Sequence, residues 1–182
     1  MKYHISREQH FFFEKNHFIE FEELLTDQEH TQLLRGIASR SNERYNLSHK
    51  SQEVQKIAYL PRLARLAAEL TGKRQMRFGF DRLIDVPLQE GTLQEKSCIN
   101  PLTCALLYSL DSAIGHGIFF LPSVPFSTLP QSTTSRYFLI AWADPRAQYL
   151  FHEEDPFTHE LKQHGYVFGD RLLEKWHPII IR

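Results

Sequence analysis

The sequence predicts an α+β protein in which helices pack outside a sandwich or jelly roll of short strands. Two observations predict this class. Residues 1–72 carry helix-start signals and apolar positions spaced three or four apart. Residues 73–182 instead hold short apolar and aromatic runs that are separated by glycine and proline. Because each part is too small to be expected to fold alone, we predict one domain over residues 1–182.

Two spacings mark helix starts in the first part. Ser6 with Gln9, and Thr26 with Glu29, are spaced as capping boxes, in which each side chain caps the other residue's backbone amide. An apolar stripe follows Thr26 and predicts a helix that ends near Ser39. Each of these helices therefore has its start fixed by local hydrogen bonding.

A further helical stretch is expected between Ser51 and Gly72. Pro61 interrupts it, because proline is best tolerated in the first turn of a helix. Gly72 suits the left-handed residue that ends a helix. The stretch is therefore predicted as two short helices, the second of which begins at Pro61.

The remaining elements are mostly strands, and turn signals such as Asp144-Pro145 separate them. The predicted strands are residues 17–21, 76–84, 102–110, 117–121, 136–142, 147–151 and 179–181. A short helix is expected over residues 155–165, with Asp155 as its cap and Pro156 at its first position. Asp81 and Arg82 are expected to form a buried or rim ion pair rather than an acid/base pair.

Composition limits the function classes. Lys and Arg number 21 against 22 Asp and Glu, so bulk charge gives no basic face for a polyanion, and a nucleic-acid partner is unlikely on this ground. The start of the chain lacks a signal-peptide core, and proline breaks the longest apolar stretch. We therefore expect a cytoplasmic protein without a membrane partner, in which Cys98 and Cys104 are free, buried thiols.

Ten histidines invite the hypothesis of a metal site. Five of them, however, are scattered through the predicted helical part and are expected to be ordinary exposed or partly buried residues. These are His4, His10, His17, His30 and His49. His116 lies between two glycines, where a role in a turn is expected.

Three segments in order carry a family resemblance. They are residues 13–19 with 23–29, residues 102–111 with 115–122, and residues 132–140. Together they resemble the phytanoyl-CoA dioxygenase-like branch of the iron(II)/2-oxoglutarate oxygenases. The chain is also similar to a conserved hypothetical family of chlamydiae. The resemblance implies a double-stranded β-helix, which is a jelly roll with the N-terminal helices packed on one face.

The resemblance also implies where an iron site should lie. The family binds iron with a His-x-Asp/Glu pair and a distant histidine. Glu90 stands at the carboxylate position, but Leu88 occupies the histidine position and offers no lone pair. No histidine lies between Pro122 and Arg136, where the distant ligand is expected. The site is therefore expected to be degenerate, with no metal, no cofactor and no catalytic residue.

Arg136 corresponds to the arginine that holds the 2-oxoglutarate carboxylate in the family. Our favoured hypothesis is a non-catalytic relative that binds a small anion at Arg136, or a protein partner of unknown kind. An alternative is an active iron(II)/2-oxoglutarate oxygenase with relocated ligands, namely His152, Glu154 and one of His159, His164 or His177. A third is a metal-responsive nucleic-acid-binding regulator.

Overall fold

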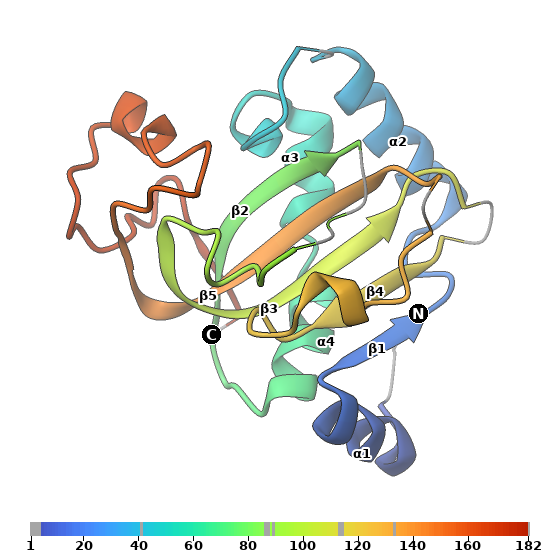
Figure 1. The fold of residues 1–182 in the computed structure, drawn as a ribbon. Helices are drawn as coiled ribbons and strands as arrows, with labels where there is room; N and C mark the ends of the chain where they lie inside the picture. The colour runs from blue at the N-terminus through green and yellow to red at the C-terminus, as the bar shows by residue number, and fades with distance from the viewer. Residues whose placement is uncertain are drawn as a thin grey trace.

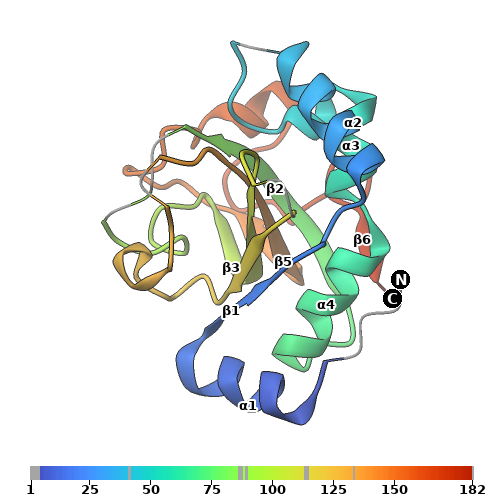
Figure 2. The same cartoon turned by 90° about the vertical axis from the view of Figure 1, so that its right-hand side faces the viewer.

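The computed structural model describes residues 5–40, 42–85, 88, 90–112, 115–132 and 134–181. One antiparallel sheet runs through the middle of the molecule (Figure 1). Helices lie along one face of this sheet, and segments with little regular structure cross the other face (Figure 2). The structure is thus mixed, with helices and a curled sheet, as the sequence predicts.

The four α-helices within the described residues begin and end close to the predicted residues. They are α1 (Arg7–Asn16), α2 (Asp27–Ala38), α3 (Gln52–Ala58) and α4 (Pro61–Thr71). Both predicted capping boxes are present, at Ser6 with Gln9 and at Thr26 with Glu29. Gly72 ends α4 in the left-handed conformation, with φ of 63°. These predictions are confirmed because each depends on hydrogen bonding within one turn of helix.

Six strands form the sheet in the order β1-β4-β3-β5-β2-β6, with every pair antiparallel. They are β1 (Phe18–Phe21), β2 (Met76–Ile84), β3 (Ile99–Ser109), β4 (Gly117–Phe120), β5 (Tyr137–Tyr149) and β6 (Ile179–Ile181). Three short 3-10 helices complete the described elements, namely η1 (Leu47–His49), η2 (Phe126–Thr128) and η3 (Glu160–His164).

Strand β5 corrects the prediction of two strands over residues 136–142 and 147–151. It is one strand, and Pro145 lies inside it. Residues 144–147 bulge out of the ladder, because they stand between two paired positions that are separated by only one residue on β3. A bulge tolerates a proline that lacks a donor. The Asp144-Pro145 signal therefore produces a bulge rather than a turn.

The predicted helix over residues 155–165 is also wrong in extent. Only η3 (Glu160–His164) forms. The Asp155 side chain accepts hydrogen bonds from Phe157 N at 2.9 Å and from Cys98 N at 2.7 Å. The same residue type that caps helices here closes a tight turn and binds a distant strand instead.

Strand β3 explains how one apolar run serves two cores. Cys104, Leu106 and Tyr108 belong to the cluster between the sheet and the helices, whereas Ala105 and Leu107 belong to the cluster on the other face. Successive side chains point to opposite faces, so a strand that is covered on both faces is apolar throughout. Cys104, like Cys98, is a buried free thiol, as expected. Among the described residues, no helix is both long and apolar enough to cross a membrane.

Candidate functional site

The sheet face away from the helices holds the positions at which an iron site is expected. The Leu88 side chain is half-buried and packs against the apolar cluster of this face. Glu90 is exposed to solvent. Residues 86, 87 and 89, which adjoin these positions, lie outside the described residues. The two expected ligand positions therefore differ in environment, and only the carboxylate is a possible ligand.

Gln131 ties the segment of Leu88 to the segment where a distant histidine is expected. Its side-chain Oε1 accepts a hydrogen bond from Leu88 N at 3.2 Å, and its Nε2 donates to Leu88 O at 3.1 Å. The same Nε2 donates to Phe126 O at 3.0 Å. The Gln131 amide thus pairs with both the backbone N–H and the C=O of Leu88, as a residue of a neighbouring strand would. The two segments are held together by this pairing.

Apolar side chains fill the space beneath this tie. Five large members of the apolar cluster on this face are at most 2% exposed, and they are Phe120, Phe126, Tyr137, Leu139 and Tyr149. The rings of Phe120 and Phe126 meet edge to face, with centroids 6.4 Å apart. Burial of each such side chain stabilises the fold by about 1.5–3 kcal/mol. The interior on this face is therefore a packed core.

Arg136 lies at the rim, just before β5. Its Nη2 donates to Asp111 Oδ1 at 2.9 Å, and its backbone N donates to Asp111 Oδ2 at 2.7 Å. The Arg136 side chain is 51% exposed. The hydrogen bond from Arg136 lowers the pKa of Asp111. Anion binding by Arg136 stays a prediction, and an anion there would share the guanidinium with Asp111.

The relocated ligand set does not come together as one group. The His152 side chain is partly buried, and Glu154 is exposed. His159 lies against the rings of two exposed phenylalanines, and His164 stacks on Trp176 at 4.1 Å. In the part of the chain that the structure describes, no three His, Cys, Asp or Glu side chains could hold a metal ion.

Buried His177 and partly buried His49 form a cluster that the sequence did not predict. His177 is 0% exposed, and its Nδ1 lies 2.7 Å from Gly79 O. His49 Nε2 lies 2.8 Å from Trp176 O, and the two imidazole centroids are 5.7 Å apart. Because a carbonyl only accepts, each contacting nitrogen carries the proton. The sequence predicts an exposed or partly buried residue at His49, and the structure has it partly buried; no local pattern indicates that it belongs to a cluster.

Burial sets the protonation of this cluster. Desolvation lowers the pKa of His49 to about 4 and that of His177 to about 3. His164, whose ring lies 5.2 Å from that of His49, has its pKa lowered for the same reason. The imidazoles of His49 and His177 are therefore neutral at pH 7, and the contact of His49 with Trp176 O joins η1 to the segment before β6.

The predicted ion pair between Asp81 and Arg82 is wrong, because the two side chains have different partners. The fully buried Asp81 carboxylate accepts hydrogen bonds from Leu47 N at 2.7 Å and Ser48 N at 3.0 Å. Arg82 instead lies over the Phe157 ring, with its guanidinium carbon 4.9 Å from the centroid. Neighbours in a strand point to opposite faces, so the two side chains diverge. Desolvation raises the pKa of Asp81 to about 6.

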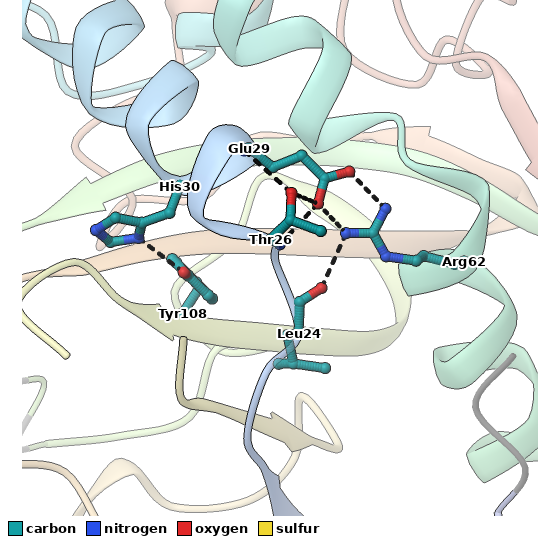
Figure 3. Close-up of polar contacts among 6 residues, drawn as sticks. All are labelled: Leu24, Thr26, Glu29, His30, Arg62 and Tyr108. Carbon is teal, nitrogen blue, oxygen red and sulfur yellow. Dashed lines mark hydrogen bonds and ion pairs between the residues drawn. The ribbon is translucent and has the colours of Figure 1, made fainter. Parts of the chain in front are cut away.

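A second polar cluster joins α2 and α4 (Figure 3). Arg62 donates to both carboxylate oxygens of Glu29, at 2.7 and 2.5 Å, and to Leu24 O at 3.0 Å. Glu29 also completes the capping box with Thr26. Although the sequence predicts the capping box, the contact with Arg62 depends on tertiary packing. This cluster joins α2 to α4 on the helical side of the sheet, whereas Leu88 packs against the apolar cluster of the other face.

Comparison with solved structures defines the class of fold. The chain has the fold of non-heme α-ketoglutarate (2-oxoglutarate)-dependent enzymes. The carbocyclase SnoK from nogalamycin biosynthesis superposes with a TM-score of 0.75 and 12% identity, over 96% of each chain. The epimerase SnoN, solved with Fe³⁺, α-ketoglutarate and nogalamycin RO, superposes with a TM-score of 0.70 and 12% identity. The match covers 92% of this chain and 95% of SnoN.

A chlamydial protein shares this fold. CT296 from Chlamydia trachomatis superposes with a TM-score of 0.63 and 23% identity, covering 79% of this chain and 98% of CT296. No protein-family model matches the sequence, and no curated protein matches it significantly. These similarities establish the fold alone. They leave the chemistry of the site to the residues that this chain carries.

The residues of the predicted site do not fit an iron ion with 2-oxoglutarate. Leu88 has no lone pair, and the sequence has no histidine from residue 123 to residue 135. Gln131 holds these two segments together over a packed apolar layer. Loss of two imidazole ligands removes most of the affinity and geometry of a three-ligand site. At the expected positions the chain therefore offers iron a single possible ligand, the Glu90 carboxylate.

Proposed function

We propose that this protein is a non-catalytic binding protein built on the double-stranded β-helix of the iron(II)/2-oxoglutarate oxygenases. The observation that carries this proposal is the tie between Gln131 and Leu88 above a buried aromatic layer. The tie and the layer occupy the region in which the sequence resemblance expects iron ligands. A packed apolar interior stabilises the fold but offers no donors to a cation.

Within that class we assign the chain to the phytanoyl-CoA dioxygenase-like branch. This assignment is supported by the order of the three resembling segments along the chain. A small anion is proposed to contact Arg136, whose exposed guanidinium keeps donors beyond those used by Asp111. An anion at this rim would be bound without entering the packed interior.

Anaerobic titration with iron(II), together with assay of succinate release from 2-oxoglutarate, tests the proposal. We expect no stoichiometric tight binding and no succinate above the level of a protein-free control. The variants Leu88→His and His152→Ala should behave as the unmodified chain does. Tight stoichiometric iron with succinate release would overturn the proposal. Loss of that iron in His152→Ala would then favour the relocated ligand set.

A further inference from the structure

Two adjoining hollows lie at the opposite end of β5 from Arg136. The inner one has a volume of about 490 Å³ and lies between α1, the end of α4 and the start of β3. Its apolar lining is Phe13, Leu70, Pro101, Leu102 and Leu121. The outer one has a volume of about 730 Å³ and lies between the start of β2 and the bulge of β5. Lys73 and Asp144 line both hollows, so the two lie side by side.

The outer hollow is positively charged. Lys73, Arg74 and Arg146 line it together with one acid, Asp144, which gives a formal charge of +2. All three cations are exposed, and none of them forms a salt bridge within the described residues. Asp144 Oδ1 instead accepts from the backbone N of Arg146 at 2.9 Å. The cationic groups are therefore available to an anion from solution.

The bulge of β5 places Asp144 and Arg146 beside Lys73 and Arg74, which lie in the connection between α4 and β2. Residues 144–147 stand opposite Pro101 alone, so the chain there leaves the plane of the ladder. Bulges commonly redirect side chains next to functional sites. The α1 wall of the inner hollow carries His10, Glu14 and His17. Because Glu14 repels anions, an anionic group is expected on the Lys73 side and not on the α1 side.

We propose that the two hollows form one binding site for a small amphiphile with a phosphate or carboxylate head and an unbranched apolar body. The head binds Lys73, Arg74 and Arg146 through charge-assisted hydrogen bonds. The body occupies the inner hollow, whose volume and mainly apolar lining are typical of small-molecule sites. This site shares no residue with the Leu88 and Gln131 tie, so it does not depend on the proposed function.

Calorimetric titration with monomeric octyl phosphate tests the site. We expect one molecule per chain, and an affinity at least about tenfold above that of butyl phosphate, because each buried methylene adds several-fold. The double variant Arg74→Ala/Arg146→Ala should bind at least about tenfold more weakly, since hydrogen bonds to charged groups are lost. Arg35→Ala, which removes an exposed arginine from α2, is the matched control and should bind as the unmodified chain does. Thermal melts establish that each variant is folded.

Several outcomes would overturn the proposal. Equal binding of octanol would mean that the cations contribute nothing, and equal binding of inorganic phosphate would mean that the apolar hollow contributes nothing. Binding that the double variant keeps would place the ligand elsewhere. Octanoate and octyl phosphate distinguish the two head groups. Phe11 and Phe12 are 67% and 45% exposed, so a further titration uses vesicles that contain anionic phospholipid. Binding to vesicles but not to monomeric octyl phosphate would contradict a site for a single small amphiphile.

Discussion

His49 and His177 make the stability of this protein fall as the pH is lowered. The pKa values of His49 and His177 are about 4 and about 3 in the folded chain, against an ordinary value of 6.5. Their contribution to stability is therefore fully present above pH 6.5 and is lost as the pH falls toward 4 and 3. Each group loses about 1.4 kcal/mol per pH unit in this window, so each costs about 2 kcal/mol between pH 7 and 5.

Asp81 opposes this change in part. Its pKa is raised to about 6 from 3.8, so its contribution is present below pH 3.8 and is lost as the pH rises through 6. Protonation of Asp81 between pH 7 and 5 returns about 1 kcal/mol. The free energy of unfolding should therefore fall by about 3 kcal/mol in total over these two pH units.

Urea unfolding at several pH values between 7.5 and 5 measures this loss. The double variant His49→Gln/His177→Gln keeps a donor for each carbonyl but does not titrate. It should be less stable at pH 7 and should lose the downward slope, so that only the opposing effect of Asp81 remains. His159→Gln replaces an exposed histidine and should keep the full slope. A slope that survives in the double variant would refute this account of acid sensitivity.

Three further variants probe single contacts. Gln131→Ala should lower stability by about 1–2 kcal/mol in urea unfolding and speed exchange of the Leu88 amide; unchanged exchange would show that the tie is not formed in solution. Asp81→Asn should cost about 2–4 kcal/mol in thermal unfolding, because one of the two accepting oxygens becomes an NH2 group that faces a buried backbone N–H, and a neutral effect would contradict the assigned hydrogen bonds. Arg62→Lys should cost about 1–2 kcal/mol because lysine cannot donate to both Glu29 oxygens, whereas Arg65→Lys, on the exposed side of α4, should cost nothing measurable.

Local chemistry explains which elements could be predicted. The Thr26 and Glu29 capping box is complete within four residues, so the sequence alone predicts the start of α2. Arg62, which donates to the same Glu29, lies on another helix, and nothing in the sequence around Thr26 indicates this contact. The Asp144-Pro145 pair predicts a turn for a similar reason, because only the pairing with β3 decides between a turn and a bulge.

In the candidate site, too, local sequence predicts some features and tertiary packing decides the others. Leu88 and the stretch without histidine indicate a degenerate iron site from residue types alone. The tie by Gln131 could not be predicted, because it joins positions from two different irregular segments. The sequence around His49 and His177 does not distinguish them from the exposed histidines. Both are shielded from solvent by tertiary packing, because the segment before β6 lies beside η1.

The pairing of β1 with β4 has a kinetic consequence. Phe18 lies opposite Phe120, so this edge of the sheet requires the chain to close a very long loop before any hydrogen bond forms. The capped helix α1 can form within microseconds in isolation, but the ladder beside it cannot. Proteins dominated by such distant pairings fold in milliseconds to seconds. In stopped-flow refolding, we therefore expect helical signal to precede protection of the β1 amides.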